Sequence, residues 1–168
     1  MANDFLPADY SSPVTGDNYY KLVKGENRFR FISSPITGWV WWTEDKEGNK
    51  KPSRIRMSDV KPDPKLKAKH FWAAVVYDYS TRTFKIFEIT QKSIQVQILS
   101  LNANEKWGSP KDYDLCIVRS GDGMETEYNV QPEPKTPVPE KEKAANAFLQ
   151  IELEVLYAGG DPFEHYKP

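Results

Sequence analysis

The chain has a single cysteine, Cys116, among its 168 residues. One cysteine cannot form an internal disulfide, and it cannot build a zinc site that depends on a cluster of thiolates. No stretch approaches the roughly 20 apolar residues of a transmembrane helix. The N-terminus has neither a basic region nor an apolar core, so we expect no signal peptide. These absences predict a protein of a reducing, aqueous compartment without membrane association.

Catalytic motifs are also missing. No glycine-rich loop leads into Lys-Ser or Lys-Thr, and there is no Gly-x-Ser-x-Gly sequence. His70 and His165 lie in unlike contexts, and Cys116 lies in an apolar stretch that is more typical of a core. We therefore expect no enzyme, no cofactor and no metal site. Asp78 with Glu88 keeps a metal-dependent nuclease as the enzyme-class alternative.

The chain has almost no net charge, at −1. The distribution is uneven. Residues 46–69 contain nine Lys and Arg against three acidic residues, whereas residues 121–168 contain four Lys against ten acidic residues. A basic middle and an acidic end indicate two surfaces with different partners, although each could be an ordinary solvated face.

Aromatic residues are plentiful, at 13% of the chain, and many lie in residues 70–89. This stretch predicts two strands joined at Ser80 and Thr81, because Val, Ile, Phe, Tyr and Trp dominate it. The first strand is almost wholly apolar, so both of its faces need cover. Trp72, Val76 and Ile86 are interpreted as core. Tyr77, Tyr79 and Arg82, near the turn, suit a flat, negatively charged ligand such as a nucleic-acid strand.

Two strands are predicted before this hairpin. Residues 28–32 alternate strictly, which places Arg28 and Arg30 on an outer face, opposite the two phenylalanines. Residues 37–43 contain three tryptophans, and the alternation places Trp39 and Trp41 on one face and Trp42 on the other. Whichever face is outward therefore shows a tryptophan, which indicates a ligand or partner.

The remaining pattern gives the fold. Residues 90–102 predict an amphipathic helix, and residues 113–130 a second hairpin with an acidic outer face. Strands, hairpin, helix and hairpin in this order predict a mainly β protein with an OB-fold, a Greek-key barrel of five to six strands. A β-sandwich is the competing fold. The expected divisions are an N-terminal arm (1–18), the OB-fold domain (19–131), a proline-rich linker (132–139), and a C-terminal helix with an acidic tail (140–168).

The basic and aromatic features together predict a groove for sequence-tolerant binding of single-stranded DNA. The residues expected to neutralise phosphates are Arg28, Arg30, Lys50, Lys51, Arg54, Arg56, Lys69 and Arg82. The residues expected to stack on bases are Trp39, Trp42, Phe71, Tyr77 and Tyr79. The main alternative is an OB-fold or β-sandwich adaptor whose exposed aromatic residues bind another protein.

Several segments resemble the OB-fold single-stranded DNA-binding proteins of tailed bacteriophages. They include Tyr-Lys-Leu-Val-Lys-Gly-Glu-Asn-Arg-Phe-Arg-Phe-Ile (20–32) with Ile-Thr-Gly-Trp (36–39), Phe-Trp (71–72), and Phe-Glu-Ile-Thr-Gln-Lys (87–92). They continue with Tyr-Asp (113–114), Tyr-Asn-Val (128–130), Ile-Glu-Leu-Glu-Val-Leu-Tyr (151–157) and Gly-Asp-Pro-Phe (160–163). The likeness covers most of residues 20–163.

The resemblance implies a role in phage DNA replication, recombination and repair, in the cytoplasm of the infected bacterial host. It also implies an acidic C-terminal tail, with Asp161, Pro162 and Phe163 at its tip, that contacts replication or recombination proteins and competes with DNA. A monomer or weak homo-oligomer is expected. Some relatives carry a structural zinc, and this chain lacks the cysteines for one.

Overall fold

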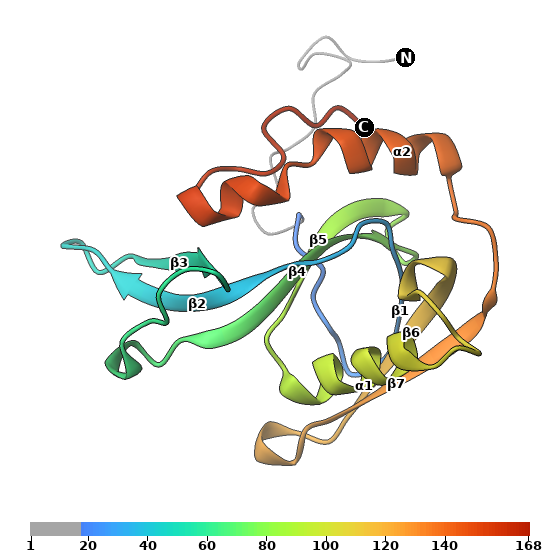
Figure 1. Ribbon diagram of the computed structural model, residues 1–168, viewed down its shortest axis with the longest axis horizontal. Coiled ribbons are helices and arrows are strands. Elements are labelled where there is room, and N and C mark those ends of the chain that lie inside the picture. The colour runs from blue at the N-terminus through green and yellow to red at the C-terminus, as the bar shows by residue number, and fades with distance from the viewer. Residues whose placement is uncertain (1–17) are drawn as a thin grey trace, which may run out of the picture.

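The computed structural model describes residues 18–168, and these residues form one antiparallel sheet of seven strands with two α-helices (Figure 1). The strands are β1 (Gly25–Phe31), β2 (Ile36–Glu44), β3 (Lys50–Arg56), β4 (Lys69–Asp78), β5 (Thr83–Ile89), β6 (Tyr113–Ser120) and β7 (Glu127–Lys135). The helices are α1 (Lys92–Ala103) and α2 (Lys141–Gln150), with short 3-10 turns η1 (Pro64–Leu66), η2 (Pro110–Asp112), η3 (Gly123–Glu125) and η4 (Leu153–Ala158).

Strand β4 is the centre of the sheet. On one edge, its first half pairs with β2 and its second half with β1, and its other edge pairs with β5. Between β1 and β2 the backbone leaves the strand conformation at Ser33, Ser34 and Pro35. There the hydroxyl of Ser33 accepts a hydrogen bond from the backbone N–H of Val75 at 2.9 Å. This N–H group of β4 therefore has a partner although no strand residue lies opposite it on that edge.

The alternation of β4 sends its side chains into two separate cores. Trp72, Ala74 and Val76 face the barrel interior, where α1 adds Ile94 and Ile98. Phe71, Val75 and Tyr77 face outward into a second core. The expectation that both faces of this strand need cover is thus met by protein on both sides.

The second core lies under the C-terminal layer, which we define as residues 141–168. Ala144, Ala147, Ile151 and Leu156 of this layer are buried in it. Figure 1 shows α2 and η4, in orange and red, lying across the sheet above β4 and β5. The C-terminal layer therefore covers much of the outer sheet face.

The hairpin of β2 and β3 extends away from the barrel as a two-stranded ribbon (Figure 1). Its base is tightly packed, because a Cβ atom on Gly38 would lie 2.0 Å from the backbone oxygen of Ile55. The C-terminal layer fixes the same region. The Tyr157 hydroxyl donates to the Thr37 carbonyl at 2.6 Å, and Arg56 pairs with Glu154 at 3.2 Å.

The predicted OB-like architecture is confirmed: the protein is mainly β, with a helix between β5 and the last hairpin and a helical C-terminal segment. The structure has seven strands, one more than the upper end of the expected five to six, and β3 lies within the basic stretch 46–69. Strand β7 continues through Pro132 and Pro134, which the sequence assigns to a linker. Proline is tolerated there because β7 ends the sheet order, so its outer N–H groups need no strand partner.

Two further observations bear on the expected divisions. Apart from Asn18, the predicted N-terminal arm lies outside the described residues. Among residues 18–168, no helix is long and apolar enough to cross a membrane.

Candidate nucleic-acid interface

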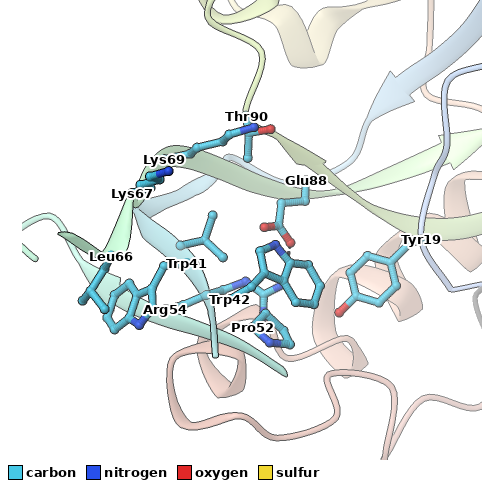
Figure 2. Close-up of a pocket in the computed structure, with 11 residues that line it drawn as sticks. Tyr19, Trp41, Trp42, Pro52, Arg54, Leu66, Lys67, Lys69, Glu88 and Thr90 are labelled. Carbon is cyan, nitrogen blue, oxygen red and sulfur yellow. Dashed lines mark hydrogen bonds and ion pairs between the residues drawn. The ribbon is translucent and has the colours of Figure 1, made fainter. Parts of the chain in front are cut away.

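A pocket of about 590 Å³ opens where the β2–β3 ribbon meets the barrel (Figure 2). We call it the ribbon pocket. Its lining residues are Tyr19, Val40, Trp41, Trp42, Pro52, Arg54, Leu66, Lys67, Lys69, Glu88 and Thr90. They come from the N-terminal end of the described chain, both ribbon strands, the loop before β4, and the end of β5.

The most buried polar group in the ribbon pocket is an ion pair between Arg54 and Glu88. Arg54 Nη2 lies 2.6 Å from Glu88 Oε2, and the side chains are only 7% and 18% exposed. The guanidinium reaches from β3 past β2 and over the Phe71 ring of β4, 5.9 Å from its centroid, to β5. Arg54 Nε is buried without a hydrogen-bond partner in the described chain. Such a donor costs about 1–3 kcal/mol, and because this nitrogen is buried, only the outer nitrogens of the guanidinium can meet a ligand.

Two aromatic rings flank this ion pair. Trp42 is 65% exposed, and Tyr19 is half-buried. Figure 2 shows Trp42, Arg54 and Glu88 gathered at the centre of the pocket, with the Tyr19 ring to the right. Burial raises the pKa of Tyr19, while Arg54 lowers it and Glu88 raises it, so the phenol shares the electrostatic surroundings of the ion pair.

Tyr19 is held in place by backbone pairing. The backbone N–H of Ile86 donates to the Asn18 carbonyl, and the N–H of Tyr20 donates to the Ile86 carbonyl, both at 2.8 Å. This short parallel bridge joins the start of the described chain to the edge of β5. It places the Tyr19 ring at the pocket although the residue belongs to no strand.

Lysines lie along the rim of the ribbon pocket. Lys67 and Lys69 are exposed at its upper edge in Figure 2, and Lys67 follows η1 in the left-handed backbone conformation, with φ of 54°. Lys50 and Lys51 are exposed on the ribbon. Lys50 pairs with Glu44 and shares the Trp42 face, whereas Lys51 pairs with Thr43 on the opposite face.

The faces of the ribbon are now assigned. Trp42 shares the ribbon-pocket face with Val40 and with Lys69, which pairs opposite Val40, whereas Trp39 lies on the opposite face and is half-buried. The Trp39 ring lies 5.5 Å from His70, and the ammonium of Lys61 lies 5.4 Å from its centroid. Trp42 is therefore the tryptophan most open to a ligand.

Three predicted contact residues lie in the protein interior. Phe71 is fully buried and Tyr77 is 4% exposed, because both belong to the core under the C-terminal layer. Arg30 lies on the face opposite Phe29 and Phe31, as predicted, but it is only 2% exposed, so the expectation that it is open to a ligand was wrong. The carbonyls of Lys111 and Thr136 accept from it at 2.8 Å, and it pairs with Asp114 at 3.3 Å.

Arg28 and Tyr79 meet at the same buried carboxylate. Asp114 receives Arg28 Nη2 and the Tyr79 hydroxyl, each at 2.7 Å. The Arg28 guanidinium lies 4.4 Å above the Tyr79 ring and covers one of its faces. The hydrogen bond to Asp114 raises the pKa of Arg28, and burial raises that of Tyr79. Arg28 is half-exposed, so it presents the flat surface that Tyr79 was expected to present.

The other predicted residues lie away from the ribbon pocket. Arg82 is exposed at the β4–β5 turn with a left-handed φ of 57°. Arg56 is exposed, but it is engaged by Glu154 and lies 4.3 Å from the Tyr157 ring centroid. In the tail, Asp161 is exposed, Pro162 is buried and Phe163 is half-buried. The tip is therefore packed against the molecule and is not free.

The structure adds Tyr19, Lys67 and Glu88 to the site. Lys67 belongs to the basic stretch already noted, so its charge was a readable signal. Tyr19 had no signal beyond its place at the start of the structured region. Glu88 was considered only as a metal ligand with Asp78. In the structure, Asp78 binds Ser80 and Lys85, Glu88 binds Arg54, and residues 18–168 contain no group of three or more potential metal ligands.

Fold and pocket together define an OB-like β-barrel with a ligand-sized opening formed by aromatic and cationic side chains. The chain is similar to a probable ssDNA-binding protein of Escherichia phage T5, with 29% identity over 139 residues. The match covers 67% of this chain and 54% of that relative, so the chain spans about half of the relative's length. This similarity confirms the resemblance to phage single-stranded DNA-binding proteins. No family model and no solved structure matches.

Proposed function

We propose that this protein binds single-stranded DNA at the ribbon pocket without catalysing a reaction. The observation that carries the proposal is that the exposed Trp42 indole lines the same pocket, of about 590 Å³, as Lys67 and Lys69. The similarity to a probable ssDNA-binding protein of phage T5 supports it.

In the proposed mode, a base stacks on Trp42 and the neighbouring phosphates lie near Lys67 and Lys69. Stacking on an aromatic side chain contributes about 1–3 kcal/mol per base and is open to any base. Lys50 and Lys51 extend the positive surface along the ribbon. Arg54 is too buried to follow a phosphate backbone, so its role is inside the pocket. Arg28 and Arg82 remain predicted phosphate contacts at the far end of β4.

The biological setting is proposed from the same similarity. The protein coats exposed single strands during phage DNA replication, recombination and repair in the host cytoplasm. Replication or recombination proteins contact its C-terminal tail. Since Pro162 is buried, such a partner meets the docked tail or displaces it.

Tryptophan fluorescence tests the proposal directly. Oligo-dT should quench the emission of the full chain at low salt, because a base covers the exposed Trp42. The logarithm of affinity should fall with the logarithm of salt concentration, with a slope of about −0.7 per phosphate contacted. A duplex of equal length serves as the control and should bind more weakly. Absence of binding at low salt, or equal affinity for the duplex, would overturn the proposal.

The protein-adaptor alternative makes a different prediction for the same side chain. If Trp42 serves a protein partner, Trp42→Ala leaves oligo-dT affinity unchanged. If it stacks on DNA, the variant binds oligo-dT more weakly.

A further inference from the structure

The ribbon pocket contains more chemistry than sequence-tolerant stacking needs. A stacking platform requires a ring and nearby cations. This pocket also holds a charged carboxylate, Glu88, that would repel a phosphate. Its position at 18% exposure, paired with an arginine at 7% exposure, shows that the carboxylate belongs to the interior of the pocket and not to its rim.

The ion pair presents fixed donors and acceptors to whatever enters. Arg54 Nη2 is bound to Glu88 Oε2, which leaves Glu88 Oε1 and further guanidinium N–H groups to meet a ligand. The ion pair also fixes the orientation of the two side chains, with the Arg54 guanidinium over the Phe71 ring. A group that enters beside Trp42 therefore meets a donor and an acceptor at set positions.

We propose that the ribbon pocket reads a nucleobase by its Watson–Crick edge and prefers guanine; this inference rests on the proposed DNA binding. Guanine carries the O6 acceptor beside two N–H donors, on N1 and N2, on one edge. Arg54 donates to O6, and the Glu88 carboxylate accepts from N1–H and N2–H. Adenine and cytosine offer one amino group on that edge and thymine one N–H, so each fills fewer of these positions.

The surroundings of the ion pair fit a base in this orientation. The pocket volume lies within the range of small-ligand sites. Trp42 offers a stacking face, and the Tyr19 hydroxyl is near enough to the ion pair for its charges to act on it. Lys67 and Lys69 at the rim can take the attached phosphates. Since the edge that is read is the one used in base pairing, duplex DNA cannot present it.

The test compares oligo-dT with three oligonucleotides of the same length that carry a single central dG, dA or dC. Isolated substitutions avoid folded G-rich structures. Fluorescence titration of the full chain should show about fivefold or tighter binding to the dG oligonucleotide than to oligo-dT, corresponding to one good bidentate contact. The dA and dC oligonucleotides should bind within about twofold of oligo-dT.

Two variants test whether the Glu88 carboxylate is responsible for the preference for guanine. Glu88→Gln should abolish the ratio between dG and dT affinities, whatever its absolute affinity, because an amide accepts from only one N–H. Glu127→Gln is the matched control, since Glu127 is exposed on β7 outside the pocket, and it should keep the wild-type ratio.

The outcomes separate the two proposals. Equal affinity for all four oligonucleotides, or a preference for another base, overturns guanine reading and leaves oligo-dT binding intact. A guanine preference that persists in Glu88→Gln overturns the role of the carboxylate. If no oligonucleotide binds at low salt, the proposed function itself fails.

Discussion

Two arginine–carboxylate clusters lie on the outer face of the sheet, and they differ in what is left over for a ligand. At one end of β4, Asp114 binds Arg28, Arg30 and Tyr79, and backbone carbonyls take further donors of Arg30. At the other end, Arg54 and Glu88 bind each other inside an open pocket, and Arg54 keeps an unsatisfied donor. The first cluster is built to hold strands together, and the second is open to a ligand.

The comparison shows why a cation in a basic, aromatic sequence is not by itself a binding residue. Arg30 and Arg54 have the same side chain, and both lie on strands. What separates them is the number of partners that the fold supplies. A guanidinium whose donors are all satisfied by the protein has little to offer a phosphate or a base.

The largest expected effect is on the stability that the Asp114 cluster provides. Asp114→Ala should lower the free energy of unfolding by about 3–5 kcal/mol, because Arg30 is left buried without its carboxylate. Urea denaturation measures the loss. Asp112→Ala, at an exposed position two residues earlier, is the control and should change stability by less than about 0.5 kcal/mol. If Asp114→Ala lost little stability, the conclusion that the Asp114 cluster holds the strands together would be wrong.

The next effect concerns the ribbon pocket, which holds the Arg54–Glu88 cluster. Trp42→Ala should weaken oligo-dT binding by about 1–3 kcal/mol through lost stacking. Its unfolding free energy should change by less than about 0.5 kcal/mol, because the ring is exposed. Fluorescence anisotropy of labelled oligo-dT measures the affinity without relying on tryptophan. Phe148→Ala removes an aromatic ring from α2 that is 54% exposed, and this variant should bind as the wild type does.

A smaller effect follows from the rim lysines. Replacing Lys67 and Lys69 together by Gln should make the slope of log affinity against log salt concentration less steep by up to about 1.4. This is the contribution of two phosphate contacts to single-stranded DNA. Affinities at several salt concentrations give the slope. The control replaces the exposed Lys106 and Lys141 by Gln, with the same loss of charge outside the pocket. An equal change in both double variants would mean that only net charge matters.

The smallest expected effect is on the pH dependence of stability, and it concerns a third paired carboxylate, Asp78. Burial raises the pKa of Asp78, but hydrogen bonds from Ser80 and from Lys85, 3.1 Å away, outweigh it and lower the pKa overall. A lowered folded-state pKa contributes stability above the unfolded value, about pH 4, and that stability is lost as the pH falls through the folded value. Asp78→Asn should therefore lose less stability than the wild type below about pH 4 in urea titrations. Asp122→Asn, exposed in a turn, should behave as the wild type does.

The strands were predictable because their signals are local. Alternation separated Trp39 from Trp42, and it placed Arg28 and Arg30 on the face opposite Phe29 and Phe31. The helix and second hairpin followed in the same way, so the OB-like architecture could be derived from pattern alone. The two prolines within β7 misled the linker assignment, because an edge strand tolerates them and a sequence pattern does not show which strand is at the edge.

Burial of the candidate site was less predictable because it depends on segments far apart in the chain. Phe71 and Tyr77 would be exposed if the chain ended after β7, and α2 and η4 bury them from more than 60 residues away. Asp114 meets Arg28 and Arg30 across the β1–β6 pairing. Tyr19 reaches the ribbon pocket through two backbone hydrogen bonds that any residue could make. None of these contacts leaves a periodic signal in the sequence.

The side chain of Gln97 has a consequence for how copies of this protein behave when crowded. Its amide nitrogen donates to the Tyr128 carbonyl and its oxygen accepts from the Val130 N–H, both at 2.9 Å, as a neighbouring strand would. This part of the outer edge of β7 is therefore occupied from within the same molecule. An open edge invites a strand from a second copy, which is a route to aggregation. Molecules gathered side by side on one nucleic-acid strand would be close enough for such pairing, and Gln97 closes this stretch of the edge against it.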